Sequence, residues 1–262
     1  MSVIEVATAE ELLQLNREST SMATVRLAPG EYHVHLELRR PMRLTGPDRN
    51  EAPAILRGEG RGPVITISDA GLDLTLESLV IVNGVATMGA GVAVHADARL
   101  HMLHCRLQGN LAGFYGGGAV YISGGEAIAQ NCVFEGNKAQ QGGAWLIDDL
   151  AHAQFENCSF VGNSSPRGGA LRIREGARVK CLNCHFSKNK GGTELSEFQD
   201  MWISGTRTRT PELHLTSTTV EGNIRNALPH PGTIIAERCK LPDSLAGDPE
   251  FRDLGHNIFI QS

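Results

Sequence analysis

With 262 residues, 41% hydrophobic side chains and 20% charged ones, the chain has enough apolar surface for a continuous core and too little charge for a disordered protein. The formal net charge is −5 and the longest basic run is Arg39-Arg40, which argues against a nucleic-acid partner, because that function needs clustered cations. The 30 glycines follow no collagen period and predict a chain that turns often.

The N-terminal segment predicts a cap and no leader. Residues 1–11 contain neither a basic region nor a long apolar core, so we expect a cytoplasmic protein. No apolar run approaches the length of a membrane span, so we expect no membrane partner. Residues 8–17 have the apolar spacing of an amphipathic helix, which would cover the first strands and prevent edge-to-edge aggregation.

Farther along, the sequence repeats at a nearly constant step. Cysteines at positions 105, 132, 158 and 184 are separated by 27, 26 and 26 residues, and each begins a segment that ends in asparagine. Gly-Gly-Ala strings at 117, 142 and 168 keep nearly the same step. Apolar residues alternate with a period of two, which predicts strands. Because one unit cannot bury its own apolar side, we expect a solenoid of roughly 26-residue coils.

Stacked coils place equivalent residues about 4.8 Å apart and predict three inward rows of side chains. A bend of one residue between the third and first rows requires a left-handed conformation, which asparagine tolerates, and stacked asparagines can hydrogen-bond between coils. The first row is Leu79, Cys105, Cys132, Cys158, Cys184 and Thr218; the second is Ile81, Leu107, Phe134, Phe160, Phe186 and Val220; the third is Met102, Ala129, Phe155, Cys181 and Leu215; the bend residues are His104, Asn131, Asn157, Asn183 and Ser217.

These units resemble the coils of the right-handed parallel β-helix superfamily of pectate lyases, and they are also similar to repeats of bacterial surface β-helices. Residues 9–15 and 25–32 resemble the capping helix and first coil of that superfamily, and residues 248–253 its closing motif. The resemblance implies an all-β fold with a short N-terminal capping helix. We expect a single domain over 1–262, with the cap at about 1–24, coils at about 25–223 and a closing segment at about 224–262.

A candidate site lies on the outward side of the Gly-Gly-Ala strands, which in the resembling enzymes forms the substrate groove. We expect Tyr121 and Leu146 to be exposed beside Arg172, because aromatic residues and arginine are enriched in protein interfaces. Phe114 and Tyr115 lie on the loop that enters this face. The first outward row is Ala93, Tyr121, Leu146 and Arg172, and the second is His95, Ser123, Asp148 and Arg174.

The carboxylates of this face do not predict a reaction, and we assign no catalytic residue. Glycoside hydrolysis needs two carboxylates about 5–9.5 Å apart, and Asp148 has only Asp149 as a second acid. A calcium-assisted lyase needs several convergent carboxylates, which Arg172 and Arg174 lack nearby. A Ser-His-Asp triad fails because His95 lies two coils, about 10 Å, from Asp148. We interpret Asp148 and Arg174 as a cross-coil ion pair.

The cysteines and histidines predict neither a metal site nor a cofactor. Cys181 and Cys184 form a C-x-x-C motif, but both fall in inward rows, and stacked thiols lie along a line instead of forming the tetrahedron that zinc requires. The remaining cysteines are interpreted as buried thiols in a reducing compartment. The ten histidines show no spacing typical of a set of ligands.

The sequence therefore favours a non-catalytic cytoplasmic β-helix protein that binds another macromolecule, first of all a protein, through the outer face of the Gly-Gly-Ala strands. An immunity or adaptor role would suit such a surface. The alternative is a small polysaccharide lyase or glycoside hydrolase of the pectate-lyase-like type, with an acidic oligosaccharide as ligand. A third interpretation, a structural repeat protein, is disfavoured by the uneven loops on one side.

Overall fold

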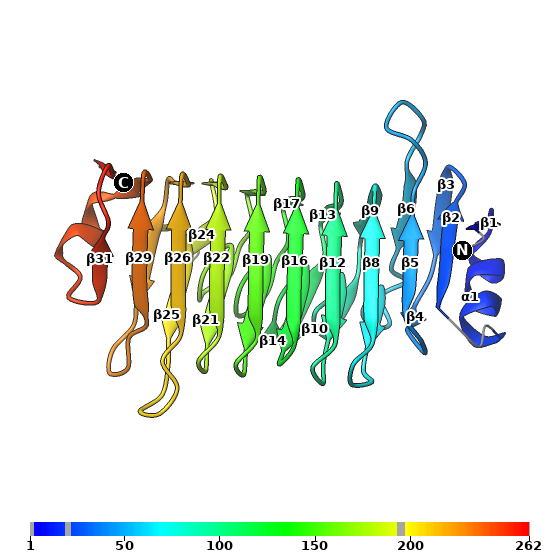
Figure 1. The fold of residues 1–262 in the computed structure, drawn as a ribbon, viewed down its shortest axis with the longest axis horizontal. Helices are drawn as coiled ribbons and strands as arrows, with labels where there is room; N and C mark the ends of the chain where they lie inside the picture. Colours follow the sequence, from blue (N-terminus) through cyan, green and yellow to red (C-terminus); the bar gives the residue numbers. More distant parts are fainter. Residues whose placement is uncertain (1–2, 19–21, 193–196, 262) are drawn as a thin grey trace.

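The computed structural model describes residues 3–18, 22–192 and 197–261. The described chain forms one elongated solenoid, with the N-terminus and the C-terminus at opposite ends (Figure 1). Three long sheets of parallel strands run along its axis, which confirms the predicted all-β parallel β-helix. Successive coils contribute strands to the sheets in turn, so equivalent residues of successive repeats lie side by side.

The first sheet contains the strands that come directly before the bend residues in the chain. Its eleven strands within the described residues are β1 (Val3–Val6), β2 (Ala23–Leu27), β5 (Met42–Thr45), β8 (Asp73–Glu77), β12 (Arg99–Leu103), β16 (Glu126–Gln130), β19 (His152–Glu156), β22 (Arg178–Leu182), β26 (Glu212–Thr216), β29 (Thr233–Glu237) and β31 (Phe251–Asp253).

The second sheet follows directly after the corner. Its order is β3 (Gly30–His33), β6 (Ala54–Arg57), β9 (Leu79–Val82), β13 (Arg106–Gln108), β17 (Val133–Glu135), β20 (Ser159–Val161), β23 (His185–Ser187), β27 (Thr219–Val220), β30 (Lys240–Pro242) and β32 (Ile258–Ile260).

The third sheet contains the Gly-Gly-Ala strands and forms the candidate face. Its order is β4 (Leu36–Glu37), β7 (Ile65–Ile67), β11 (Val92–Val94), β15 (Val120–Ser123), β18 (Trp145–Asp148), β21 (Leu171–Arg174) and β25 (Glu197–Ser204), with β28 (Asn223–Asn226) parallel and β24 (Lys190–Gly191) antiparallel to β25. Before the third-sheet strands, β10 (Val85–Met88) and β14 (Leu111–Gly116) form a separate parallel pair.

The three predicted inward rows are confirmed, because every member is buried. The phenylalanines of the second row stack face to face, with ring centroids 4.8 Å apart for Phe134 and Phe160 and 4.4 Å for Phe160 and Phe186. Both cysteines of the C-x-x-C motif are buried free thiols, as expected for members of these rows. A core of in-register layers is the main source of the stability of a solenoid.

The corner residues confirm the predicted bend. His104, Asn131, Asn157, Asn183 and Ser217 all have φ between 49° and 55°, in the left-handed region. The Nδ2 of Asn183 donates a hydrogen bond to Oδ1 of Asn157 on the preceding coil at 2.6 Å. In each of these coils, one left-handed residue between two β-strands therefore turns the backbone from the first sheet into the second.

The Gly-Gly pairs are required for a steric reason, which differs from the reason for the corner residues. Gly142 has φ +60°, and a β-carbon there would overlap the carbonyl oxygen of Trp145. A β-carbon at Gly143 would overlap the carbonyl oxygen of Gly169 on the next coil. Only glycine lets the backbone pass this closely as the chain enters the third sheet.

The interior holds a ladder of asparagines that the repeat pattern did not predict. Four asparagines on successive coils are fully buried, and each side-chain amide donates to the side-chain oxygen of the next. The last amide donates to Asp200, which belongs to β25. The members of this interior ladder are Asn110, Asn137, Asn163 and Asn189.

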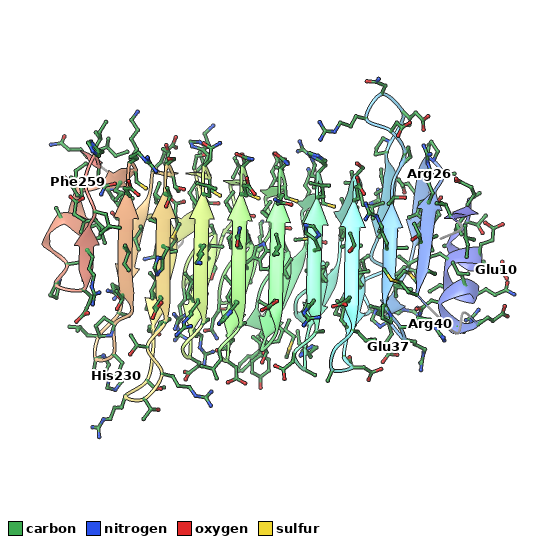
Figure 2. All side chains as sticks on the ribbon, viewed as in Figure 1. Glu10, Arg26, Glu37, Arg40, His230 and Phe259 are labelled. Carbon is green, nitrogen blue, oxygen red and sulfur yellow. The ribbon has the colours of Figure 1, made fainter. Side chains whose placement is uncertain are left out.

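The predicted cap is present as α1 (Ala9–Glu18), whose Leu12 is buried against the first coil. Its start is fixed reciprocally, because Oε2 of Glu11 accepts the backbone N–H of Thr8 and Oγ1 of Thr8 accepts the backbone N–H of Glu11. Glu10 of this helix and Phe259 of β32 mark the two ends of the solenoid (Figure 2). No helix among the described ranges is long and apolar enough to span a membrane.

The C-terminal part extends the sheets farther than the expected coil region. Segment 224–262, expected to close the solenoid, supplies β29 and β31 to the first sheet and β30 and β32 to the second. A short 3-10 helix, η1 (Asp243–Gly247), lies between β30 and β31 and buries Leu245. The parallel stacking therefore continues to the last described strands.

Candidate functional site

The outward rows of the third sheet are in the predicted register, but Ala93, Leu146 and Arg172 are buried and the remaining members are only partly exposed. Tyr121 pairs with Leu146, and Leu146 pairs with Arg172 on the next coil. The expectation that Leu146 is exposed is wrong, since it is only 1% accessible, and Arg172 beside it is only 7% accessible. Leu146 lies between Tyr121 and Arg172 in its row, and Tyr121 itself is half-buried.

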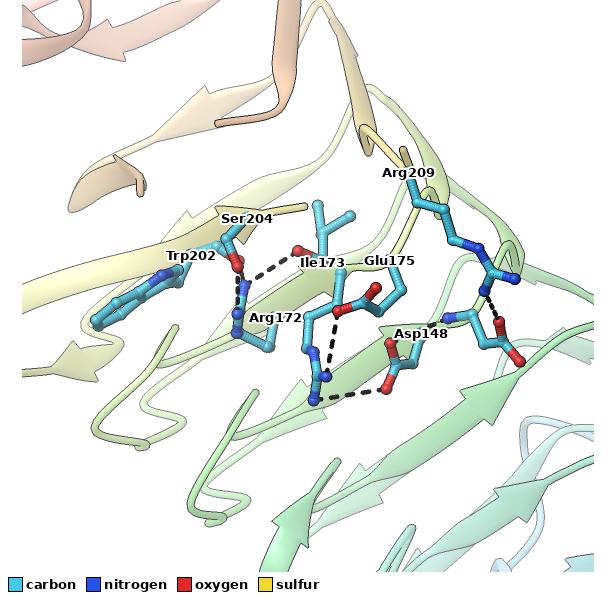
Figure 3. Close-up of polar contacts among 9 residues, drawn as sticks. Asp148, Arg172, Ile173, Glu175, Trp202, Ser204 and Arg209 are labelled. Atoms are coloured by element: carbon cyan, nitrogen blue, oxygen red, sulfur yellow. Dashed lines mark hydrogen bonds and ion pairs between the residues drawn. The ribbon is translucent and has the colours of Figure 1, made fainter. Parts of the chain in front are cut away.

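Arg172 is buried because its guanidinium folds back onto the sheet. Nη1 donates to the carbonyl oxygens of Ile173 and Trp202, both at 3.1 Å, and Nη2 donates to Oγ of Ser204 at 2.6 Å (Figure 3). Burial, followed by the charges of neighbouring arginines, lowers the pKa of Arg172 to about 9. Arg172 therefore fastens β25 to β21.

The predicted ion pair between Asp148 and Arg174 is confirmed, at 3.6 Å between Oδ2 and Nη1. Nη2 of Arg174 also lies 3.5 Å from Oε1 of Glu175, a second acid that the sequence analysis missed (Figure 3). Asp149, expected to be the second acid, pairs instead with Arg209. Burial raises the pKa of Asp148, with the charge of Arg174 opposing it. These carboxylates are thus held by arginines instead of facing each other across a gap.

His95 and Tyr121 meet at the start of the same face, with ring centroids 5.3 Å apart. Burial lowers the pKa of His95 and raises the pKa of Tyr121. Both shifts favour the uncharged form near neutral pH. The two side chains therefore offer neutral hydrogen-bonding groups beside the charged Asp148–Arg174 pair.

A groove lies next to this face, where the loops enter the third-sheet strands. Its volume is about 970 Å³, against about 480 Å³ for the hollow beside residues 47–53. None of its described lining residues is acidic, and two are arginines, so the described lining carries a net positive charge. The lining residues are Gly113, Phe114, Gln140, Gln141, Pro166, Arg167, Gly192, Trp202 and Arg225.

Trp202 and Phe114 are the aromatic residues among the described lining of this groove. The Cζ of Arg225 lies 4.4 Å from the centroid of the indole ring, and that of Arg172 lies 5.8 Å from it. Both are within cation–π distance. Of the predicted site residues, Phe114 lines the groove. The ring of Tyr115 packs edge-on against the ring of Phe114, with ring centroids 5.5 Å apart.

Trp202, Arg225 and the two glutamines of the groove were not predicted from the sequence. The signal for Trp202 was present, because Met201-Trp-Ile-Ser204 matches Leu171-Arg-Ile-Arg174 after a longer spacer. Part of that spacer, residues 193–196, lies outside the described residues. No group of three or more histidine, cysteine, aspartate or glutamate side chains in the described chain is arranged to hold a metal ion.

Comparisons with known proteins agree with this architecture. A pectin methylesterase from Aspergillus niger in penultimately deglycosylated form has a TM-score of 0.58 at 14% identity, covering 98% of this chain and 90% of that one. Its deglycosylated form gives 0.54 at 12%, covering 99% and 90%. An alginate lyase from Paenibacillus sp. str. FPU-7 gives 0.50 at 13%, covering 99% and 98%. At these identities the likeness shows the fold alone.

None of the curated proteins compared with this chain matches it. A family model described as "Right handed beta helix region" matches residues 90–227, which is more than half of the chain. The matched segment contains the cysteine repeats, the Gly-Gly-Ala strands and all the described lining residues of the groove. The chain therefore belongs to the right-handed β-helix family.

Proposed function

We propose that the chain binds an acidic oligosaccharide in the Trp202 groove and holds it without chemical turnover. The observation that carries this proposal is a groove of about 970 Å³ in which an indole ring, two arginines and two glutamines converge. An indole face packs against a sugar ring, guanidinium groups pair with carboxylates, and side-chain amides hydrogen-bond hydroxyl groups. The size lies within the range of ligand sites.

Two further observations support the proposed ligand and the absence of turnover. The structural neighbours are named as a pectin methylesterase and an alginate lyase, and pectin and alginate are acidic polysaccharides. Asp148 and Glu175, the carboxylates near the outer face, both lie against Arg174. Each carboxylate is thus charge-paired with the same arginine and is not free to attack a sugar.

Trp202→Ala is expected to weaken binding of a hexameric uronate oligosaccharide at least about tenfold. The variant loses the indole ring, which provides the stacking surface for a sugar and the cation–π contact with Arg225. Isothermal titration calorimetry with acidic and neutral oligosaccharides measures this loss. Leu182→Ala, an exposed apolar position on the first sheet, is the matched control and should bind like wild type. Equal affinity in the Trp202 and Leu182 variants would place the ligand elsewhere.

The same titration separates binding from catalysis. The wild-type protein should leave the length and the ester content of the oligosaccharide unchanged over many hours. Chromatography of the oligosaccharide recovered from the protein measures both. Turnover that disappears in Asp148→Asn would instead support the polysaccharide lyase or hydrolase alternative.

A second candidate function is the binding of a partner protein. It is favoured by an exposed ridge on β14 that consists of Phe114 and Tyr115. Phe114 and Tyr115 are 78% and 52% exposed, and exposed aromatics are the residues that most often anchor protein interfaces. In this alternative the compartment is the cytoplasm, which suits six unpaired cysteine thiols.

Phe114→Ser/Tyr115→Ser is expected to lose a protein captured by the wild type, because two aromatic anchors are removed from the ridge. Capture on immobilised protein with mass spectrometry measures the loss, and Trp202→Ala is the matched control that should retain the partner. A partner that stays on the double variant rules the ridge out.

A further inference from the structure

One coil replaces the single corner residue with a loop. Between β5 and β6 the chain passes through residues 46–53, which project beyond the row of corners (Figure 1). The backbone N–H of Gly46 donates to the carbonyl oxygen of Glu77 at 2.8 Å, and the carbonyl oxygen of Pro53 accepts the backbone N–H of Gly30 at 3.2 Å. Both ends of the loop are therefore tied to neighbouring coils.

A hollow lies between this loop and the corners of the following coils. Its volume is about 480 Å³, and a smaller hollow of about 390 Å³ adjoins it. We call the two together the corner hollow, and its size is within the range of ligand sites. It has no described lining residue in common with the Trp202 groove. The lining residues shared by its two parts are Pro47, Asp48, Arg49, Ser78 and His104.

Two basic side chains at this junction have no counter-charge. Within the described chain, neither the guanidinium of Arg49 nor the imidazole of His104 has a hydrogen bond or an ion pair. Burial lowers the pKa of His104, and the nearby positive charge of Arg49 lowers it further, against the charge of Glu77. Other charged groups of the wall are already paired: Arg26 with Asp48, Glu77 with Arg43, and Arg106 with Glu135.

The donors at the junction come from three different directions. Arg49 belongs to the loop, whereas Ser78 and His104 are left-handed corner residues of two successive coils, about 4.8 Å apart. A guanidinium, a hydroxyl and an imidazole can each donate to an oxygen of the same anion. A phosphate group offers three acceptor oxygens in a tetrahedral arrangement, so it suits such a set better than a planar carboxylate.

The larger part of the corner hollow has an apolar floor. Val80 and Val133 lie on either side of Arg106 in an outward row of the second sheet, and both are partly exposed. Pro47 and Pro53 of the loop line the same space. This floor suits an apolar group attached to the anion, because its burial removes apolar surface from water.

We propose that the corner hollow binds a phosphate monoester with an apolar body. The phosphate lies at the junction of Arg49, Ser78 and His104, and the body lies over Val80 and Val133. This site is separate from the proposed oligosaccharide groove, so it can be present whether or not the groove binds a sugar.

Isothermal titration calorimetry with phenyl phosphate tests the site. Arg49→Gln should weaken binding at least about tenfold, because a charge-assisted hydrogen bond is lost. His104→Asn should weaken it at least about threefold, and it introduces the residue that the next three coils have at this corner, so the fold is retained. Arg252→Gln, at an exposed arginine of β31, is the matched control and should bind like wild type.

A gain of affinity excludes misfolding as the cause of these changes. Glu51 is exposed and lines only the larger part of the hollow, so Glu51→Gln removes a negative charge and should tighten binding at least about twofold. Inorganic phosphate, which has no apolar body, should bind more weakly than phenyl phosphate.

Four results would overturn the proposal. One is equal affinity for phenyl phosphate in Arg49→Gln and Arg252→Gln. Another is binding that is lost in Trp202→Ala and kept in Arg49→Gln, which would assign the ligand to the groove. Tighter binding of benzoate than of phenyl phosphate would exclude the phosphate, and equal affinity for inorganic phosphate would exclude the apolar body.

Discussion

Asn163→Ala is expected to lower the free energy of unfolding by about 2–6 kcal/mol, because the carbonyl oxygen of Phe134 and the backbone N–H of Asn137 each lose their side-chain partner, and an unsatisfied buried group costs about 1–3 kcal/mol. The carbonyl oxygen of Phe134 and Oδ1 of Asn189 lose a donor at 2.9 Å. The backbone N–H and Nδ2 of Asn137 lose their shared acceptor. Urea-induced unfolding followed by circular dichroism measures the change.

The matched control is Asn157→Gly, at an exposed corner with φ 52°. Glycine adopts this conformation without strain, so the loss should stay below about 1 kcal/mol. If the two substitutions cost the same, the interior ladder contributes nothing beyond an ordinary surface amide.

Phe160→Ala is expected to cost about 3–5 kcal/mol, the range for removing a large aromatic side chain from a packed core. Its ring is fully buried and stacks on Phe134 and Phe186 on the two neighbouring coils, so the cavity opens in the middle of the solenoid. Because each coil contacts only its neighbours, the layers on both sides are disturbed. The same urea titration measures the change.

Phe259→Ala is the matched control in the last strand, where the ring is half-buried and contacts Phe251 edge-on at 6.1 Å. It has a coil on one side only, so the loss should be less than half of that for Phe160→Ala. Equal losses would contradict the view that the stacked layers hold the core together.

The repeat made the core predictable. In a stack of in-register coils, residues one period apart occupy the same position, so the recurring cysteines and phenylalanines must share one environment. The corner asparagines were predictable for a related reason, because a switch of parity between two strands needs one left-handed residue. The capping helix was predictable from its apolar spacing.

Exposure of the candidate site was harder to predict. Alternation assigns Leu146 and Arg172 to the outward side, but their burial depends on the sizes of side chains on neighbouring coils and on where a long guanidinium folds. The groove depends on loops that do not repeat, and Trp202 follows an irregular spacer. The interior ladder was missed because an asparagine that ends each unit looks like a residue of a polar turn.

The ladder has a direction as well as a length. Each Nδ2 donates toward the C-terminal end, from Asn110 through Asn137, Asn163 and Asn189 to Asp200, so the four amide dipoles point the same way. Their positive ends face the carboxylate, as peptide dipoles face an anion at the N-terminus of a helix. At the negative end, the backbone N–H of Gly84 donates to Oδ1 of Asn110. The solenoid therefore contains a polarised column along its axis, with a single acidic group at its positive pole.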